Sequence, residues 1–405
     1  MVSKHPLHSM CSYLGCFPAA VPRRILKDHV PTGATVLDPF CGSGTTLLES
    51  ALLGYPSIGI DLNPLAVAVA RAKTQNVCLE DVTDRLFALS HEYRGADLDH
   101  LREGIKLIFH PRTLAQLVFL RDALDPRDPV DAFIQGTVLG IMHGKHKKGG
   151  RTTAYLSIDM PNTFSMSPEY VRGFVAQHGL KQLPIDVFGK VRDRATWLLR
   201  EGAAPKLPLQ VLEGDAVQLP AVLRRAGVSS VDAIVTSPPY LGILRYGAFN
   251  WIRLWFLGHE PAPVDRMLDS TDSLDRYLSF MSSFLSAAGE VVRPGGTVAL
   301  VIGDVVEFGS QLQLANRVWE ELAGLVPFEK QSIRSDKFDA TVKTTRIWGQ
   351  EKKGRATPLD RVLVLKRAAV PRGKPSAKPV RQTRSTRGVA RKVRSTPISP
   401  RRVRR

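Results

Sequence analysis

Two short stretches hold most of the side chains that could carry out chemistry. The first is DPFCGSGTT, residues 38–46, a glycine-rich turn between an apolar run and a run of helical character. Gly42 and Gly44 allow the backbone to approach a ligand closely and to take positive φ values. Hydroxyl groups and free N–H groups at the start of a helix suit a carboxylate or a phosphate. The hydroxyl side chains of this turn are Ser43, Thr45 and Thr46.

The second stretch is TSPPY, which ends an apolar run abruptly. Neither Pro238 nor Pro239 has an N–H group for a β ladder, so the strand must end by about Thr236. Each proline fixes its φ at about −65°, which preorganises the Ser237 hydroxyl and the Pro238 carbonyl as hydrogen-bond acceptors. Tyr240 adds a flat ring on which a planar ligand could stack.

Three acidic residues follow apolar, strand-like runs, namely Asp38, Asp61 and Asp215. Asp61 comes about twenty residues after the glycine-rich turn, where an acid can bind both hydroxyls of a ribose. Asp215, in LEGDA, could accept a hydrogen bond from an amine such as the adenine N6, and is otherwise a plain turn residue. Neither a P-loop nor a full dinucleotide motif is present. The three acids favour a cofactor that joins adenosine to an amino acid.

Alternating strands and helices are predicted around these motifs. Strands are expected at 35–38 and 57–61, and helices at 45–53 and 64–73, which is the pattern of a βαβ unit in a parallel sheet. Further strands are expected in LPLQVLEGD, VDAIVT, TVALVIGDV and LDRVLVLKR. We therefore predict one doubly wound α/β sheet.

A helical insert is predicted to interrupt this sheet. Its segments PRTLAQLVFLRDAL, PVDAFIQGTVLGIMHG, SPEYVRGFVAQHG and DVFGKVRDRATWLLREG carry apolar residues at helical spacing after a Pro, Ser or Asp. The expected division is a first half of the catalytic domain at 1–74, the insert at 75–206, a second half at 207–366 and a disordered basic tail at 367–405.

The combination of DPFCGSGTT and TSPPY resembles the amino-methylating DNA methyltransferases, the N4-cytosine and N6-adenine family. The resemblance covers roughly His8–Thr74 and Leu209–Lys366. It implies a class I methyltransferase (Rossmann-like), mostly parallel seven-stranded sheet, with S-adenosyl-L-methionine as cofactor. In that family, the segment before the turn packs around the methionine part, and YLGCFPAAVP takes this place here. The cofactor-binding residues that the residues and the resemblance predict are Phe17, Pro18, Asp38, Pro39, Phe40, Gly42, Ser43, Gly44, Thr45, Thr46, Asp61, Asp215 and Thr236.

Methyl transfer to an exocyclic amine is the chemistry that the resemblance assigns to the Ser-Pro-Pro-Tyr corner. The lone pair of such an amine is delocalised into its ring, and hydrogen-bond acceptors would draw the nitrogen toward a nucleophilic geometry in line with the methyl group. Tyr240 would stack a base flipped out of the duplex. Methylation of cytosine C5 is disfavoured, because its cysteine nucleophile usually follows a proline and none of the four cysteines does. The predicted catalytic residues are Ser237, Pro238, Pro239 and Tyr240.

Ser237 carries the prediction of the target base. The family's adenine enzymes mostly have Asp or Asn at this position and its cytosine-N4 enzymes mostly have Ser, so the resemblance favours the N4 of cytosine in double-stranded DNA. N6-adenine methylation, RNA amino-methylation and a non-catalytic nucleic-acid-binding protein are the alternatives. The expected role is modification in a restriction–modification system, with a separate endonuclease as functional partner. The oligomeric state is not predicted.

The net charge of +18 is concentrated near the carboxyl end. Lys366 to Arg405 hold 15 of the 56 basic residues and no acid, and subtracting these 15 from +18 leaves +3 for residues 1–365. Such a segment cannot bury enough apolar surface to fold, and we expect it to be attracted to nucleic acid, with a solubilising tail as the alternative. With no membrane span, no secretory leader and no metal-binding cysteine pattern, a cytoplasmic, nucleoid-associated prokaryotic protein is predicted.

Two further segments could contact DNA. HGKHKKGGR, residues 143–151, is a basic, glycine-rich loop suited to backbone phosphates or simply to solvent. LGILRYGAFNWIRLWFLG follows the catalytic corner, and its aromatic residues fit a base-entry site and a buried helix face equally well. The insert precedes LEGDA, so its part in reading the DNA sequence is left open. The candidate DNA-binding residues are Lys145, Lys147, Lys148, Arg151, Arg245 and Tyr246.

Overall fold

The computed structural model describes residues 4–144, 155–159, 167–241, 245–268, 271–307, 310–337 and 356–368. Met1–Pro371 form one compact unit. Several predictions concern residues outside the described ranges. They are the basic-loop residues Lys145, Lys147, Lys148 and Arg151, and the basic tail from residue 369 onward.

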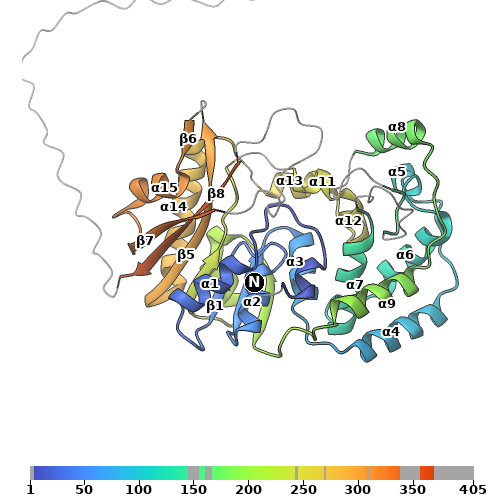
Figure 1. The fold of residues 1–405 in the computed structure, drawn as a ribbon, viewed down its shortest axis with the longest axis horizontal. Helices are drawn as coiled ribbons and strands as arrows, with labels where there is room; N and C mark the ends of the chain where they lie inside the picture. The colour runs from blue at the N-terminus through green and yellow to red at the C-terminus, as the bar shows by residue number, and fades with distance from the viewer. Residues whose placement is uncertain are drawn as a thin grey trace, which may run out of the picture. The chain divides into compact units, whose positions relative to one another are not determined.

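A mixed sheet forms the centre of this unit (Figure 1). Its strand order is β3-β2-β1-β4-β5-β8-β7, and the short β6 pairs with β5. Every pairing from β3 to β5 is parallel, and β8 runs antiparallel between β5 and β7. The prediction of a class I methyltransferase α/β fold is confirmed, with β6 as an additional short strand. The strands are β1 Val36–Asp38, β2 Ser57–Asp61, β3 Leu209–Glu213, β4 Val231–Thr236, β5 Val292–Glu307, β6 Ser310–Leu312, β7 Phe328–Lys337 and β8 Ala356–Arg367.

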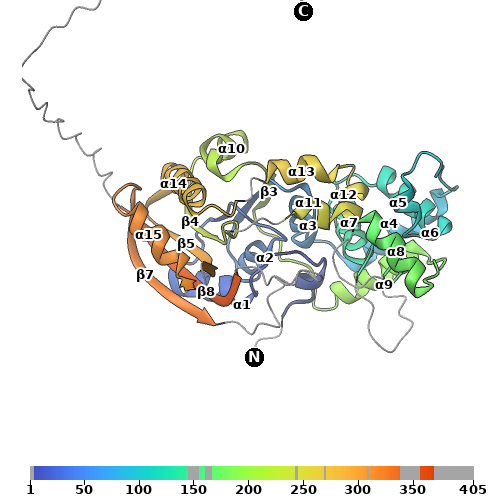
Figure 2. The same ribbon diagram turned by 90° about the horizontal axis from the view of Figure 1, so that it is seen from above.

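Helices cover both faces of the sheet, and side chains alternate between them along each strand. Val36 of β1 packs with α1, whereas the next residue, Leu37, packs with α14. Figure 2 shows α10 and α14 on one face and α1 and α2 on the other. The helices of this part are η1 Pro6–Ser9, α1 Ala20–His29, α2 Thr45–Leu52, α3 Pro64–Lys73, η2 Ala216–Gln218, α10 Leu219–Arg225, α14 Leu274–Val291 and α15 Leu314–Leu322. Burying both faces explains why the central strands are apolar throughout.

Between α3 and β3, the described part of the chain forms six helices. They are α4 Leu79–Glu92, α5 Glu103–Lys106, α6 Pro111–Ala123, α7 Pro129–Ile141, α8 Pro168–His178 and α9 Val187–Leu198. Ser and Asp residues cap three of these helices at their N-termini, as their place in the sequence predicts. Asp128 accepts hydrogen bonds from the N–H groups of residues 130 and 131 at 2.9 Å, and Ser167 and Asp186 cap α8 and α9. The four segments of helical pattern correspond to α6, α7, α8 and α9. The boundaries drawn at 74, 206 and 366 stay predictions.

The helix α7 packs closely against the N-terminal segment and α3. A Cβ atom at Gly140 would overlap the Met10 carbonyl, and one at Gly136 would overlap Ala72. Side chains of η1, α3, α7 and α9 share one apolar cluster. None of the helices in the described part of the chain combines the length and the apolar character needed to cross a bilayer.

Short helices follow β4 in the described residues, and the strand itself ends at Thr236, as predicted from the prolines. They are α11 Tyr246–Phe249, α12 Trp251–Phe256 and α13 Pro261–Met267. Arg253 of α12 is fully buried, and its guanidinium donates to the Leu139 carbonyl and the Asn250 side chain. The arginine thus ties this segment to α7 and does not face the cavity described below.

Candidate active site

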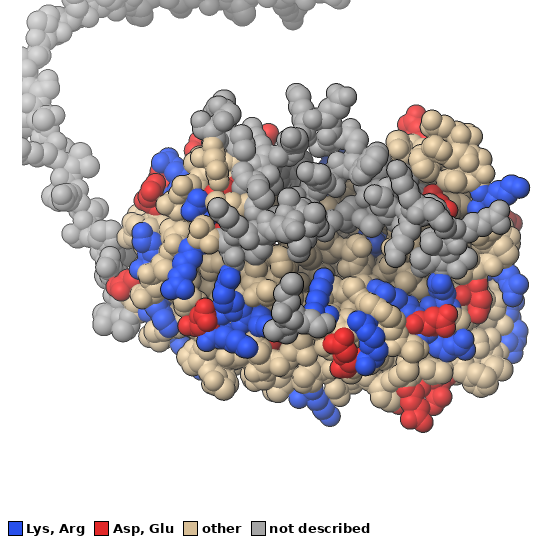
Figure 3. Space-filling model, viewed as in Figure 1, with Lys and Arg blue, Asp and Glu red and all other residues tan. Residues whose placement is uncertain are grey.

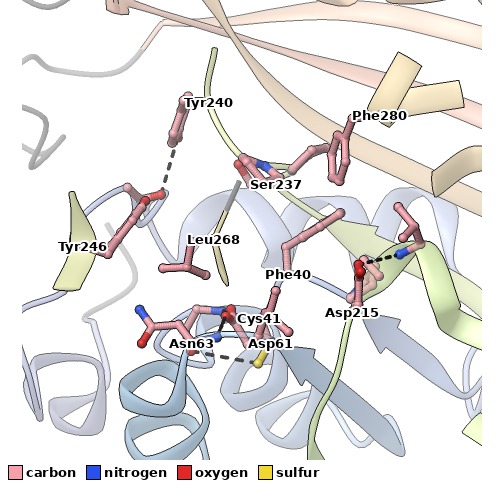
Figure 4. Close-up of a pocket in the computed structure, with 18 of the residues that line it drawn as sticks. Phe40, Cys41, Asp61, Asn63, Asp215, Ser237, Tyr240, Tyr246, Leu268 and Phe280 are labelled. Atoms are coloured by element: carbon pink, nitrogen blue, oxygen red, sulfur yellow. Dashed lines mark hydrogen bonds between the residues drawn. The ribbon is translucent and has the colours of Figure 1, made fainter. Parts of the chain in front are cut away.

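A cavity of about 510 Å³ lies at the carboxyl ends of four neighbouring parallel strands. Its lining includes residues that directly follow β1, β3 and β4, together with Asp61 at the end of β2 (Figure 4). From β1 the chain continues to β2 and β3 on one side of the sheet, and β4 and β5 then lie on the other side of β1. The cavity therefore lies at the topological switch point, where open α/β sheets bind ligands. The N-terminal segment, α14 and residues of α11 and α13 also contribute to the lining.

The glycine-rich turn depends on two positive φ values, 49° at Gly42 and 74° at Gly44. The Gly44 N–H donates to the Cys41 carbonyl at 2.7 Å, which closes the turn before α2 begins. A Cβ atom at Gly44 would lie 3.0 Å from both the Cα and the Cβ of Ala70 on α3. Gly44 therefore provides both the backbone conformation and the close approach of two helices.

Gly44→Ala is expected to destabilise the protein by about 2–4 kcal/mol, because left-handed backbone strain adds to overlap with the α3 backbone. Gly54→Ala is the matched control, because Gly54 has a φ of 82° and open space around it. This variant measures the cost of left-handed backbone strain without any overlap. Its expected cost is about 1 kcal/mol. Urea unfolding of both variants measures the difference, and equal losses would contradict the packing role of Gly44.

Asp61 is held by the backbone at both carboxylate oxygens. Oδ2 accepts from the Gly42 N–H at 2.8 Å, and Oδ1 accepts from the Asn63 N–H at 2.9 Å. Burial raises the pKa of Asp61 to about 6, against the opposing effect of these N–H groups. Each oxygen keeps a further lone pair for a ligand hydroxyl, so the side chain is preorganised as an acceptor in the cavity.

Asp38 lies behind the cavity rather than in its lining. Its Oδ1 accepts from the Thr236 hydroxyl at 2.5 Å and from the Phe40 N–H at 3.2 Å. Burial raises the pKa of Asp38 to about 6, and the bond from Thr236 opposes that rise. The pair joins the glycine-rich turn to the end of β4, and so fixes the position of one motif relative to the other.

Asp215 caps the short helix η2, where its Oδ1 accepts from the Val217 N–H at 3.0 Å. It lines the cavity together with Ala216 and Val217. Apolar rings face the same space: Phe40 packs against Phe280 at 5.8 Å between ring centroids (Figure 4). This part of the cavity therefore combines a carboxylate with an aromatic surface.

The Ser-Pro-Pro-Tyr corner lines the cavity with all four of its residues. Ser237 Oγ is closed off from solvent and has no hydrogen-bond partner of normal geometry among the described residues. The Tyr240 hydroxyl donates to the Gly15 carbonyl at 3.5 Å. Burial raises the pKa of Tyr240, and the nearby Ser237 hydroxyl opposes this rise only in part. The phenol is therefore neutral, and the Ser237 oxygen keeps unused hydrogen-bonding capacity.

The N-terminal segment reaches the corner through stacked tyrosines. Tyr13 stacks on Tyr246 with ring centroids 5.9 Å apart, and its hydroxyl accepts from the Asn63 side chain at 2.9 Å. Burial raises the pKa of both phenols. Tyr246, a DNA-contact candidate in the sequence, thus belongs to the cavity lining, while its neighbour Arg245 is exposed and outside that lining.

The predicted site residues divide into those in the lining and those behind it. The lining holds Phe17, Pro39, Phe40, Gly42, Thr45, Asp61, Asp215, Ser237, Pro238, Pro239, Tyr240 and Tyr246. Pro18, Asp38, Ser43, Gly44, Thr46 and Thr236 stand outside it. Lining residues that the sequence did not single out include Tyr13, Cys16, Asn63, Leu268 and Phe280. Tyr13 and Cys16 belong to the stretch YLGCFPAAVP that the resemblance places around the methionine part, although neither was named by itself. Asn63 had a local indication, since an Asn before Pro64 is a typical helix cap and its side chain accepts from Leu65.

The strand order and the position of the cavity are those of the class I methyltransferase fold. Residues 3–72 match the family model of a DNA methylase, N6_N4_Mtase. The type II methyltransferase M.MjaII of Methanocaldococcus jannaschii is 40% identical over 111 residues, which is 26% of this chain and 21% of that protein. M.Cfr9I of Citrobacter freundii is 32% identical over 101 residues, 25% of this chain and 27% of that protein.

These matches span about a quarter or less of the curated relatives' length. Among solved structures, the rRNA methyltransferase AviRa of Streptomyces viridochromogenes is 15% identical, with 91% of each chain covered and a TM-score of 0.34. That likeness is too loose to bear on substrate or activity.

The residues present fit S-adenosyl-L-methionine, which the fold and the family match imply as the cofactor. Asp61 would accept from the ribose hydroxyls, and Asp215 from the adenine amine. The rings of Phe40 and Phe280 would cover the purine. When bound, the cofactor supplies an electrophilic methyl group on a sulfonium, and the protein's task is to bring a nucleophile to it.

Proposed function

We propose that this protein is a DNA amino-methyltransferase that transfers the methyl group of S-adenosyl-L-methionine to an exocyclic base nitrogen. The observation that carries the proposal is one cavity lined by Asp61, Asp215 and all of the Ser-Pro-Pro-Tyr corner. The match of residues 3–72 to a DNA methylase model and the type II methyltransferase relatives support the nucleic-acid substrate.

Ser237 and Pro238 act on the amine in this proposal. The Ser237 Oγ atom lacks a hydrogen-bond partner of normal geometry among the described residues, so it keeps acceptor capacity for an amino N–H. The Pro238 carbonyl is a second acceptor on a backbone whose φ the ring fixes. Two acceptors direct the nitrogen lone pair toward the methyl group, and preorganisation lowers the cost of reaching the transition state.

Tyr240 supplies the stacking surface for a base that leaves the duplex. Its ring faces the cavity, and its hydroxyl is held by the Gly15 carbonyl. A target atom inside the base stack is out of reach of such a recessed site, so the base would have to flip out. The ring needs no chemistry of its own, because stacking and positioning are its contribution.

Cytosine N4 is the proposed target atom and double-stranded DNA the proposed substrate. Support for cytosine rests on Ser237, where the resembling adenine enzymes mostly carry Asp or Asn. The type II relatives support a modification role beside a separate restriction endonuclease. The division of the chain into two catalytic parts around a helical insert belongs to the same proposal.

Figure 3 shows Lys and Arg interspersed with Asp and Glu on the face in view, over both the sheet part and the insert. On this face, the coloured residues do not gather into a single basic patch. Phosphate attraction is therefore proposed to come from the basic loop at 143–151 and the basic tail.

Methylation of nucleic acid in vitro tests the proposal. The purified protein is incubated with isotopically labelled S-adenosyl-L-methionine and either unmodified heterologous genomic DNA or total RNA, and the labelled nucleoside is identified by mass spectrometry. We expect N4-methylcytosine in DNA. N6-methyladenine would overturn the choice of base, label in RNA alone would overturn the DNA substrate, and no label in either would favour a non-catalytic binder.

A further inference from the structure

Lys73, the last residue of α3, is sealed in the protein interior with 1% of its surface exposed. Lysines are almost never fully buried unless they are paired, because removing an ammonium group from water is costly. Lys73 belongs neither to the glycine-rich turn nor to the Ser-Pro-Pro-Tyr corner. A buried ammonium group at this place therefore requires a partner that compensates its charge.

The partner that the structure gives Lys73 is neutral. Its Nζ donates to Ser43 Oγ at 3.2 Å, and no carboxylate pairs with it among the described residues. The neighbouring buried acid, Glu49, is already bound by Arg23 at 2.5 Å and by His8 at 2.7 Å. An ammonium carries three donors, so Lys73 keeps hydrogen-bonding capacity and an uncompensated positive charge.

Ser43 connects this charge to the cavity. Its hydroxyl oxygen accepts from Lys73 and lies 3.1 Å from the Cys16 Sγ, which belongs to the cavity lining. Either group can donate in the Ser43–Cys16 contact, and an ammonium behind Ser43 favours the arrangement in which the Ser43 hydroxyl donates to Cys16. The arrangement places positive polarity behind the part of the cavity formed by the N-terminal segment and the glycine-rich turn.

The cavity lining itself is poor in positive charge. Asp61 and Asp215 provide carboxylates, while Arg276 on α14 is the one Lys or Arg in the lining among the described residues, and its side chain is exposed. The proposed cofactor ends in an amino acid whose carboxylate needs a cation or several donors. Lys73 supplies a buried positive charge beside the glycine-rich turn, and Ser43 and Cys16 connect this charge to the cavity.

We propose that Lys73 is a positioning residue that selects ligands with a carboxylate: its buried charge, relayed through Ser43, favours the amino-acid end of the cofactor near Cys16. The inference rests on the proposed function, because it assigns that cofactor to this cavity. It also predicts which part of the cofactor Lys73 recognises, since ligands that lack the carboxylate gain nothing from the lysine.

A pair of ligands tests this without any methylation assay. S-adenosyl-L-homocysteine carries the carboxylate, and 5′-methylthioadenosine keeps the adenosine and sulfur but lacks it. Calorimetric Kd values are measured for the full chain, for Lys73→Met, which keeps the length of the side chain, and for Lys27→Met, an exposed lysine on α1. Lys73→Met should weaken S-adenosyl-L-homocysteine roughly tenfold to thirtyfold and 5′-methylthioadenosine less than about threefold.

The outcomes separate the inference from the proposed function. Equal weakening of both ligands, or no weakening of either, overturns the role of Lys73 alone. A wild-type protein that binds neither ligand overturns the proposed function and the inference with it. Lys27→Met should leave both Kd values unchanged. The melting temperature of ligand-free Lys73→Met should equal or exceed that of wild type, because a buried charge has been replaced by an apolar chain.

The pH dependence of binding provides a second test on the unmodified protein. Burial lowers the pKa of Lys73 to about 8, so its charge is lost as pH rises from 7 to 9. The affinity for S-adenosyl-L-homocysteine should fall over this range in wild type more steeply than in Lys73→Met. A fall of the same size in both proteins would contradict the inference.

Several other ionisable groups surround Lys73. Lys4, His8, Cys11, Cys16 and Cys41 interact with it electrostatically. Burial lowers the pKa of His8 to about 4 and raises the pKa of Cys11 and Cys41, so these three stay neutral through most of this range. Lys4 is exposed. Repeating the titration on Cys16→Ser should preserve the pH dependence, and its disappearance would assign the effect to the thiol instead.

Discussion

Ser237→Ala is expected to lower kcat by about 10²–10³-fold, the effect of removing one preorganised hydrogen-bonding group aimed at a reacting atom. The Kd for S-adenosyl-L-methionine should stay within about twofold, because one hydroxyl in the cavity is lost and no described protein hydrogen bond of normal geometry is broken. The effect falls on turnover because the acceptor acts on the amine as the methyl group is transferred.

The measurement combines two assays on the same preparation. Turnover is followed with labelled cofactor and saturating unmodified genomic DNA, and cofactor binding is followed by calorimetry. Ser230→Ala is the matched control: it removes a hydroxyl just before the other end of β4, where Arg293 donates to Ser230 at 3.0 Å, far from the reacting atoms. It should leave kcat unchanged. A loss of binding as large as the loss of turnover would contradict the role given to Ser237.

The sequence predicted the sheet and the two motifs because both depend on local rules. Gly42 and Gly44 are needed for a turn of positive φ, and Pro238 and Pro239 cannot continue a strand. Strand β2 and helix α3 occupy the predicted ranges, since a βαβ unit leaves little freedom in where its elements begin. These features required no knowledge of tertiary contacts.

The rest of the site depended on contacts between segments far apart in the chain. Tyr13 reaches Asn63 across 50 residues and stacks on Tyr246, and no local pattern marks any such pairing. Phe280 lies on an amphipathic helix whose apolar face looks like ordinary core. Lys73 shows the same limit, because a lysine in the last turn of a helix is usually a solvated, dipole-compensating residue, and only packing reveals that it is buried.

The sequence also could not show which of the predicted site residues lie behind the cavity and not in its lining. Asp38 was predicted to contact the cofactor, yet its carboxylate accepts from Thr236 and from the backbone of the turn. Asp38 and Thr236 thus join the glycine-rich turn to the catalytic corner. An acid at a strand end looks the same in sequence whether it faces a ligand or the neighbouring strand, so the distinction required the register of β1 and β4.

Asp61→Asn should raise the Kd for S-adenosyl-L-methionine about 10²-fold, the equivalent of losing one or two charge-assisted hydrogen bonds of about 1.5–3 kcal/mol each. Both carboxylate oxygens accept from backbone N–H groups, at Gly42 and at Asn63. An amide in their place must turn its NH₂ group toward one of these donors. The substitution therefore removes the charge and also disturbs the turn that carries it.

Glu213→Gln is the matched control for this prediction. Glu213 stands beside Asp61 in the register of β2 and β3, is exposed, and lies outside the cavity lining. It should bind the cofactor as wild type does. If Glu213→Gln weakened binding as much as Asp61→Asn, charge at this edge of the sheet, and not the contact with ribose, would be the cause.

The pH dependence of cofactor binding distinguishes Asp61 from its buried neighbour Asp38. Burial raises the pKa of both carboxyls to about 6. The charged form of Asp61 is the better acceptor for hydroxyl groups, so wild-type affinity should fall as pH drops through 6. In Asp61→Asn this fall should disappear, because no group facing the ribose then titrates. If it persisted, protonation of Asp38 and loosening of its contact with Thr236 would control binding, and Asp61 would be a structural residue of the turn.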